Sequence, residues 1–268
     1  MELVRCSAPL LPDGSVLRCF GYRGYFAQAR ARRLAPGGDV KLIVRLGDPL
    51  RFAAGASGAV PATASAFVVG LNDGPGRTVH AGDVHSLQLH LTPLGAYRVL
   101  GVPMQALSGA AVELAEVLGR PVVDELVERL ATTDDWDARF RLIGQMLGER
   151  TAATAPPDPA VAWAWRRLSR SGGGVGVGEL AAELGVSRRH LTRRFHHQVG
   201  LPPKSLARVL RFRRAVRLHA EMPGRSWSRI AAECGYYDHA HLDADFRSLA
   251  ACTPTEFVTR SDGFSLPS

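Results

Sequence analysis

Residues 187–217 read SRRHLTRRFHHQVGLPPKSLARVLRFRRAVR, and this stretch decides the fold of the second half of the chain. It contains ten Lys or Arg residues and no Asp or Glu. Because DNA presents a dense line of phosphate charge, a helical segment with this one-sign charge is a candidate phosphate-binding surface. The ten cations are Arg188, Arg189, Arg193, Arg194, Lys204, Arg208, Arg211, Arg213, Arg214 and Arg217.

The stretch contains part of a helix-turn-helix pattern that occurs twice, with turns at Gly185 and Gly235. In contrast to the first copy, residues 227–257 carry two Arg against five acidic residues. This difference predicts that the two copies contribute unequally to binding a phosphate backbone. The helices predicted in this half are Ala160–Ser169, Val177–Leu184, Ser187–Val199, Pro203–Glu221, Ser228–Glu233 and Asp238–Leu249.

Local signals define the second helix of the first copy. Ser187 is a good N-cap, and Val186 and Leu191 stand at the positions of a hydrophobic staple. Leu191 also begins the inward apolar stripe that continues at Phe195 and Val199. The N-terminal half of such a helix enters the major groove, where Arg commonly contacts guanine. The residues on the other face are Arg189, Thr192, Arg193 and His196.

The second copy repeats these signals with a different outer face. Asp238 is the predicted N-cap, and Tyr237 and Leu242 are the predicted staple pair. Asp243 and Asp245 are expected to repel phosphate, although an Asp can accept a hydrogen bond from a cytosine amine. The inward stripe is Leu242, Phe246 and Leu249, and the predicted exposed face is His239, Ala240, Asp243 and Ala244.

Residues of about 160–260 resemble the AraC/XylS family of bacterial transcription regulators, whose signature is a doubled helix-turn-helix joined by one long helix. The resemblance implies a DNA-binding protein that contacts two successive major-groove segments. The residues that carry it are Glu179-Leu-Ala, Leu184-Gly-Val-Ser187, His190-Leu, Arg193-Arg-Phe195, Gly200-Leu-Pro-Pro-Lys204, Arg211, Arg214-Ala215, Ile230-Ala231, Cys234-Gly-Tyr236, Asp238, His241, Phe246-Arg247 and Thr253-Pro-Thr-Glu-Phe257.

The resemblance assigns base contacts and the charge pattern assigns backbone contacts. Because Ala244 stands where the family usually has Arg, and Asp243 where it has Ser or Thr, we expect the first motif to supply most of the affinity. The base-contact candidates are Arg189, Thr192, Arg193, His239, Ala240, Asp243 and, by the resemblance, Ala244. The DNA backbone-contact candidates are Ser187, Arg188, His190, Arg194, His196, Lys204 and Arg208.

The composition shows where the positive charge lies along the chain and excludes several classes of protein. The 268 residues are enough for two domains, each with its own core, and the net charge is +8. Residues 1–157 hold 16 basic and 15 acidic side chains, whereas residues 158–268 hold 17 and 10. No apolar run of about 18 residues predicts a transmembrane helix, and the N-terminus does not resemble a signal peptide. The four scattered Cys residues argue against a zinc site or a disulfide framework and favour a reducing cytoplasm.

The first half predicts a mainly β domain with trailing helices, so the fold class is multidomain: an α+β N-terminal domain and an all-α C-terminal domain. The expected division is residues 1–150, a Pro-rich linker at 151–159 and a DNA-binding domain at 160–262. Ala53–Ala66 is expected to be a loop. The predicted strands are Val16–Tyr22, Val40–Leu46 and Ser86–Thr92, and the predicted helices are Met104–Leu118, Pro121–Leu130 and one from Asp134 or Asp135 to Leu147.

The role of residues 1–150 stays open at this point. Their order of strands and helices resembles the effector or dimerisation domain of such regulators, but the sequence names no small-molecule effector. The Met104–Leu118 stripe suits either a homodimer surface or a core-facing helix. His80, His85 and His90 invite a metal-site hypothesis, but their spacing of five alternates strand faces and no carboxylate completes the set. We expect no metal and no cofactor.

The expected function is therefore a cytoplasmic, sequence-specific transcription regulator that is not an enzyme. Its partners are double-stranded DNA and, by the resemblance, RNA polymerase, which favours an activator; no membrane partner is expected. One alternative is a ligand-sensing or protein-interaction module with weakened DNA affinity, because the second motif is acidic. Another is a thiol-dependent DNA repair enzyme fused to the same domain, but Cys6 and Cys19 show no activating neighbours in the sequence.

Overall fold

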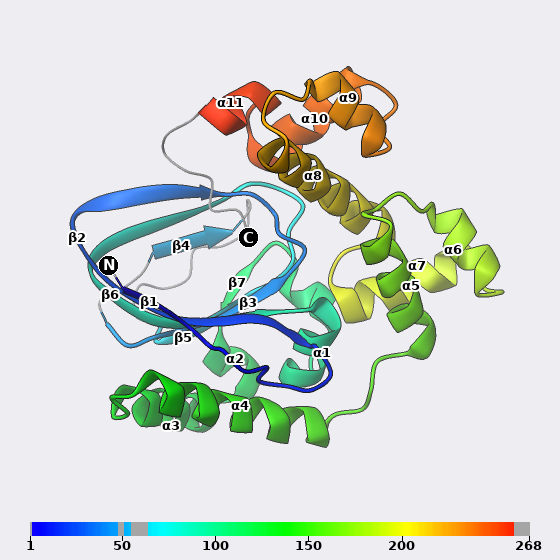
Figure 1. The fold of residues 1–268 in the computed structure, drawn as a ribbon. Helices are drawn as coiled ribbons and strands as arrows, with labels where there is room; N and C mark the ends of the chain where they lie inside the picture. The colour runs from blue at the N-terminus through cyan, green and yellow to red at the C-terminus, as the bar shows by residue number, and fades with distance from the viewer. Residues whose placement is uncertain (1, 48–50, 55–63, 260–268) are drawn as a thin grey trace.

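The computed structural model describes residues 2–47, 51–54 and 64–259, and it joins a β domain to a helical domain (Figure 1). The described strands form one antiparallel sheet in the order β1-β2-β6-β3-β5-β7, with β4 paired to β6. The strands are β1 (Glu2–Arg5), β2 (Val16–Leu34), β3 (Val40–Arg45), β4 (Arg51–Ala54), β5 (Ala66–Val69), β6 (Gly76–Leu91) and β7 (Ala111–Glu113). The mainly β first half is thereby confirmed.

β2 and β6 are much longer than the predicted strands because they form a bent ribbon. They pair from Val16 with Leu91 to Leu34 with Gly76, and the register shifts between Phe26 and Arg30. The ribbon curls at the left of Figure 1, so its outer half returns above the rest of the sheet. β4 pairs with the returning half of β6. The sequence predicted only the inner halves, where one face is buried against helices.

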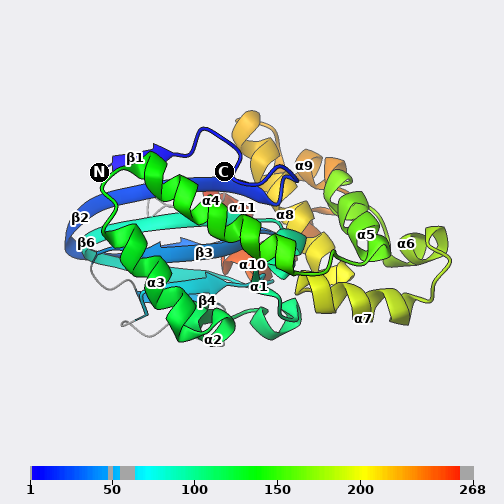
Figure 2. The same cartoon turned by 90° about the horizontal axis from the view of Figure 1, so that it is seen from below.

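Helices cover one face of the sheet (Figure 2). Alternate residues of β3 and β6, such as Leu42, Val44 and Leu89, are buried and join the cluster that includes the helices. Helices of this domain are α1 (Pro93–Leu100), the 3-10 helix η1 (Met104–Leu107), α2 (Leu114–Leu118), α3 (Arg120–Ala131) and α4 (Trp136–Ala153). α3 and α4 confirm the predicted helices there, and Asp135 caps α4 by accepting a hydrogen bond from the Ala138 N–H.

Two predictions in this region are wrong. Met104–Leu118 is not one helix, because Gly109 adopts a positive φ of 67° and Ala111–Glu113 then pairs with β5. Met104, Leu107 and Leu114 are buried, so this stripe belongs to the core. The linker is also shorter than 151–159, since α4 continues to Ala153 and the next helix begins at Pro159. The predicted loop at Ala53–Ala66 lies mostly outside the described residues, but its first two residues end β4 and its last residue begins β5.

The C-terminal domain follows the predicted helices closely. Each boundary differs from the prediction by no more than one residue, because caps and turn glycines mark the helix ends. A short final helix was not predicted, and residues 260–262 lie outside the described part. The helices are α5 (Pro159–Arg170), α6 (Val177–Glu183), α7 (Arg188–Val199), α8 (Pro203–Glu221), α9 (Trp227–Glu233), α10 (His239–Ala250) and α11 (Pro254–Thr259).

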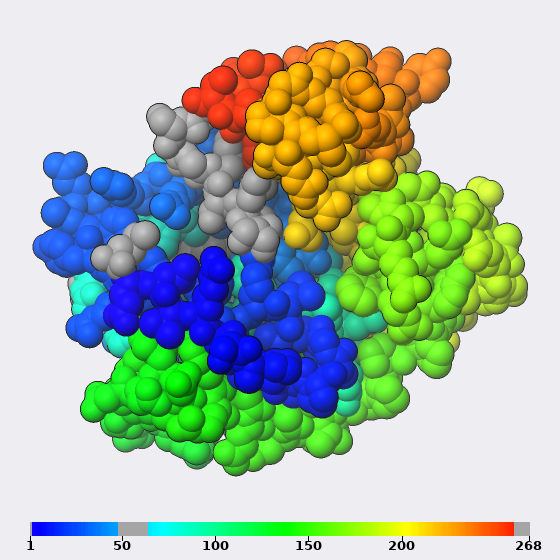
Figure 3. Space-filling view, viewed as in Figure 1, coloured from blue at the N-terminus to red at the C-terminus, as the bar shows by residue number. Residues whose placement is uncertain are grey.

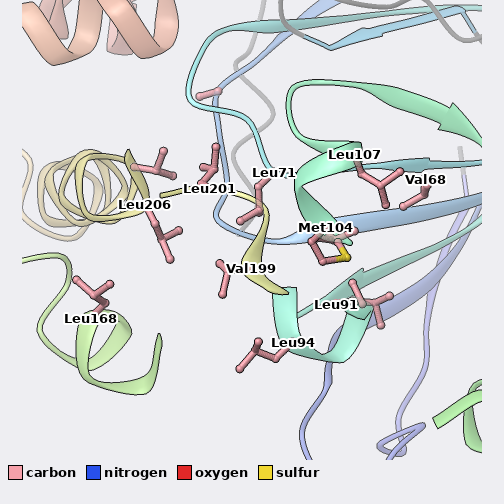
Figure 4. Close-up of a cluster of buried hydrophobic side chains, with 14 of the residues drawn as sticks. Val68, Leu71, Leu91, Leu94, Met104, Leu107, Leu168, Val199, Leu201 and Leu206 are labelled. Atoms are coloured by element: carbon pink, nitrogen blue, oxygen red, sulfur yellow. The ribbon is translucent and has the colours of Figure 1, made fainter. Parts of the chain in front are cut away.

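A continuous hydrophobic cluster joins the two halves of the chain. A single cluster of buried side chains runs from the sheet to the helical domain. Figure 4 shows Val199 and Leu201 of the helical domain on one side of this cluster and Leu71, Leu94 and Met104 of the β domain on the other. Ser108 beside η1 also donates a hydrogen bond to the carbonyl of Gly200. The end of α7 is therefore built into the β domain, while α6 projects away from it (Figure 3).

Candidate nucleic-acid interface

The N-terminal half of α7 presents its basic side chains to solvent. The Ser187 hydroxyl accepts a hydrogen bond from the His190 N–H at 3.2 Å and so caps the helix as predicted. Leu191, Phe195 and Val199 are almost completely buried, which fixes the rotation of the helix. Arg189 and Arg193 consequently point outward and are exposed.

An open hollow surrounds this half of the helix. Its lining combines base-contact candidates with backbone-contact candidates, and free N–H groups at a helix start also favour anions. These side chains therefore present an exposed, positively charged surface to a negatively charged partner. The lining residues are Ser187, Arg188, Arg189, His190, Thr192 and Arg193.

The ten cations of residues 187–217 do not form one surface. Arg188, Arg189, Arg193 and Lys204 are exposed, and none of them forms an ion pair with an acidic side chain of the described chain. Most of the others have a partner within the protein, some of them at its surface. Their contacts are Arg194 with Asp158 at 2.7 Å, Arg208 with Asp245 at 2.9 Å, Arg211 with the Gly173 carbonyl at 3.1 Å and Arg217 with Glu221 at 3.7 Å.

Two predicted backbone contacts thus have structural partners. Asp158 is mostly buried, caps α5 through the Ala160 and Val161 N–H groups, and pairs with Arg194. Its own N–H donates to the Gln198 side chain at 3.0 Å, so the start of α5 is tied to α7. Arg208 is held by Asp245 and by Ser248 at 3.2 Å, which ties α8 to α10. Of these contacts, only the Asp158 cap has a local signal, because Asp158 directly precedes Pro159.

The second motif has the predicted backbone but a different surface. The Asp238 carboxylate accepts from the His241 N–H at 2.7 Å, and Leu242, Phe246 and Leu249 are fully buried. Tyr237, however, is 93% exposed, so its predicted staple contact with Leu242 is wrong. The candidates His239 and Ala240 are exposed at the start of α10, as is Ala244 one turn on.

The acids of the second motif are largely neutralised. Asp245 is only 3% exposed and faces Arg208, so the expectation that it repels phosphate is wrong. Asp243 is half-buried and lies 3.5 Å from both the Arg247 guanidinium and the His239 imidazole. The ordinary pattern of charges one turn apart on a helix explains this arrangement. The second motif therefore presents a nearly uncharged outer face.

A buried ionic cluster joins the β domain to α8, and the sequence did not predict it. The His90 imidazole contacts the Asp39 carboxylate at 2.5 Å. Burial alone would raise the pKa of Asp39, but the His90 hydrogen bond and the nearby charges of Lys41 and Arg213 hold it at about 2. Burial also lowers the pKa of Lys41 and Arg213. The charge that Arg213 contributes is thus directed at the β domain.

The three histidines singled out in the sequence have different neighbours. His80 lies 3.3 Å from the Thr78 hydroxyl, His85 lies 3.3 Å from Arg139, and His90 contacts Asp39. They do not converge, and within residues 2–47, 51–54 and 64–259 no three such ligands gather around one point. Within the same ranges, no helix is both long enough and apolar enough for a membrane span.

Comparison with known proteins adds independent information. A family model described as a helix-turn-helix domain matches residues 180–260. No curated relative matches the chain. Among solved structures, ToxT from Vibrio cholerae O395 has 12% identity and a TM-score of 0.48 over 91% of this chain and 97% of its own.

Two further solved structures are similar over smaller shares. The C-terminal domain of AraT, a response regulator from Geobacillus stearothermophilus, has 20% identity and a TM-score of 0.36 over 38% of this chain and 85% of its own. The AraC-like transcriptional activator CuxR has 17% identity and a TM-score of 0.32 over 79% of each chain. The family match, rather than these likenesses, classifies this part of the chain: residues 180–260 are an AraC-type helix-turn-helix domain.

Proposed function

We propose that the protein binds a specific, asymmetric DNA site in which α7 supplies most of the affinity and α10 contacts a second, neighbouring segment. The observation that carries the proposal is the hollow around the start of α7, where Arg188, Arg189 and Arg193 are exposed and unpaired with described acids. Guanidinium groups at this end of a recognition helix suit guanine in the major groove.

Different residues around α7 have different proposed roles. Arg189, Arg193 and Thr192 lie on successive turns of one face and suit base edges. Arg188, His190, His196 and Lys204, with the capping Ser187, suit phosphate contacts that position the helix without reading sequence. Arg194 and Arg208 support these elements from inside through Asp158 and Asp245, and we propose that support as their main role.

We propose that α10 binds DNA more weakly than α7 does and adds some sequence selectivity. Its exposed start offers His239 and Ala240, and Asp243 is paired along the helix with Arg247. Such a face lacks a strong phosphate contact but is small enough to approach base edges closely. In a double motif the two faces lie about one turn of DNA, roughly 34 Å, apart.

The two halves of the chain have different proposed roles. We propose residues 160–262 as the DNA-binding domain and residues 1–150 as an effector-sensing or dimerisation domain. The continuous hydrophobic cluster supports a direct influence of the first on the second, because α1 and η1 pack against α7. The resemblance seen in the sequence favours an activator that contacts RNA polymerase. Transcription in vitro with and without the protein tests this, and lower output in its presence would show a repressor.

Selection from random duplex DNA with the purified full-length protein tests the DNA-binding proposal. We expect enrichment of a site with a G-containing block and a second block about one turn away. Enrichment of the first block alone would confine recognition to α7. No enrichment at moderate salt would overturn the proposal and favour a module whose DNA affinity is weak. An Arg189→Ala, Arg193→Ala double variant is the control, because it should lose the G-containing block while keeping the fold.

A further inference from the structure

Two cysteines that are far from any known motif face each other across neighbouring strands. β1 pairs with β2 in a register that sets Arg5 opposite Phe20, and the next pair along the ladder is Cys6 and Cys19. The Cys6 N–H donates to the Cys19 carbonyl at 3.0 Å, so the pairing continues through these residues. Opposite residues of an antiparallel pair project their side chains to the same face, with Cβ atoms about 5 Å apart.

The two thiols share surroundings as well as register. Cys19 is 6% exposed and lies in the main hydrophobic cluster, and the half-buried Cys6 packs against that same cluster. Burial raises the pKa of Cys19, and the neighbouring Cys6 thiol raises it further, which is an effect of short distance. Neither cysteine forms a disulfide in the structure, and the Cys6 thiol donates a hydrogen bond to the Ala8 carbonyl at 3.2 Å.

We propose that Cys6 and Cys19 form a reversible disulfide when the protein meets a peroxide, which makes this pair a redox-modification site. A disulfide needs Cβ atoms about 3.5–4.5 Å apart, so the strands must approach by roughly 1 Å. β1 is a four-residue strand at the edge of the sheet and can make that movement. The mild strain that remains makes the bond easier to reduce, as a reversible modification requires.

The more accessible thiol reacts first. The Cys6 thiolate attacks one oxygen of hydrogen peroxide, the O–O bond breaks, and the departing hydroxide takes a proton to become water. Cys6 is then a sulfenic acid. The Cys19 sulfur attacks the Cys6 sulfur, the S–O bond breaks, and the departing hydroxide takes the Cys19 proton. In total, two thiols lose two electrons and two protons, and one peroxide becomes two waters. A dithiol reductant reverses the change by exchange.

The bond would close a loop that supports the helical domain. Within this loop, Asp13 pairs with Arg98 of α1 at 3.0 Å, and the Ser15 carbonyl accepts from the Thr92 N–H at 2.8 Å. α1 in turn carries Tyr97, whose ring lies 6.0 Å from that of His197 on α7. Figure 3 shows the first residues of the chain, in dark blue, at the surface, where an oxidant can reach them. Oxidation therefore stiffens the layer on which the recognition helix rests.

Thiol counting and peptide mapping of the full-length protein test the proposal. After hydrogen peroxide and unfolding, we expect two free thiols in place of the four of the reduced protein. Trypsin cleaves after Arg5, Arg18 and Arg23, so the two cysteines fall in separate peptides that the disulfide joins. The joined pair should be lighter by about 2 Da than the sum of its reduced peptides. Dithiothreitol should restore four thiols, and the oxidised protein should melt about 5 °C higher.

Matched variants separate this pair from the other cysteines. Cys6→Ser should abolish the joined peptides and the rise in Tm, whereas Cys234→Ala should retain both. Because Cys6 is half-buried, the Ser variant should fold, and an unchanged melting curve in reductant checks this. Four free thiols after peroxide, a Cys6 sulfinic acid without joined peptides, or joined peptides found only in a covalent dimer would each overturn the proposal. None of these results depends on DNA binding, so they leave the proposed function untouched.

Discussion

The two helix-turn-helix motifs have the same backbone arrangement, but their charged side chains have different partners. α7 and α10 have equivalent caps, at Ser187 and Asp238, and equivalent buried stripes. At the start of α7, cations face solvent without acidic partners among the described residues. At α10, by contrast, acids are paired with arginines of the same domain.

The motifs also differ in their support. The end of α7 is built into the β domain through Gly200, Val199 and Leu201, whereas α10 is tied to α8 by the Arg208–Asp245 pair. One repeated architecture can therefore place a binding surface in one copy and use the same kind of charge for internal cohesion in the other. Sequence charge alone does not distinguish these uses.

The largest effect is expected from Arg208→Ala, which tests whether Arg208 serves cohesion or DNA. Removing it leaves the Asp245 carboxylate buried without its partner, so the free energy of unfolding should fall by about 3 kcal/mol. Urea denaturation measures this. Arg217→Ala is the control, because its pair with Glu221 is exposed and should contribute less than about 0.5 kcal/mol. If Arg208→Ala left stability unchanged but weakened DNA binding, Arg208 would instead contact phosphate, as the sequence predicted.

Arg193→Ala should have the largest effect on DNA binding. Loss of one guanidinium–guanine contact costs about 1–3 kcal/mol, or roughly 5- to 150-fold in Kd. Equilibrium titration of a selected site at fixed salt measures it, beside single alanine changes at His239 and Asp243. If either change in α10 weakened binding more than Arg193→Ala, the ranking of the two motifs would be reversed. Arg217→Ala again controls for general loss of positive charge.

The junction between the β domain and α8 should be sensitive to acid. Burial lowers the pKa of His90 below its ordinary 6.5, even though Asp39 opposes the shift. The unfolded chain therefore binds a proton at higher pH than the folded chain. His90 thus favours the fold above about pH 6.5, and this contribution is lost as the pH falls toward the lower folded value.

Stability at two pH values measures the effect. As the pH falls from the unfolded pKa of His90 to its lower folded pKa, the free energy of unfolding should decrease by up to about 1.4 kcal/mol for each pH unit. His90→Gln keeps a donor for Asp39 but does not titrate, so its stability should depend less steeply on pH than that of the natural protein. Equal slopes for the two proteins would remove His90 from the explanation.

The smallest effect is expected from Asp243→Ser, which sharpens the description of the second motif. The change removes a half-buried acid and frees Arg247, so affinity for random duplex DNA should rise by about 2- to 3-fold at low salt and less at high salt. Ala240→Ser is the matched control, since it adds a hydroxyl nearby without changing charge. An unchanged binding curve for Asp243→Ser would mean that its pairing already cancels the charge.

Local rules predicted the helical domain well. The caps Ser187 and Asp238, the stripe through Phe195 and the turn glycines each act within one or two turns of chain, so the sequence displays them directly. The same holds for the inner part of β6, where alternation marks a strand with one buried face. The short strands β1, β5 and β7 gave no such signal, because three or four residues contain too little periodicity.

The features that the sequence did not predict depend on tertiary contacts. Arg208 and Asp245 stand 37 residues apart, and only the crossing of α8 and α10 brings them together. Asp39 and Arg213 are further apart still, and they meet because α8 packs on the β domain. The exposure of Tyr237 also depends on the path of the chain into α10, since a staple requires a contact that this path does not make.

The length of α8 determines how the two motifs are rotated relative to each other. α8 is a continuous helix of 19 residues, which is about 28 Å of nearly straight backbone between the two motifs. One residue added to it would advance the second motif by only about 1.5 Å but would turn it by roughly 100° about the helix axis. The angular phase between the two recognition helices is therefore set by a residue count, and this segment should tolerate substitution far better than insertion or deletion.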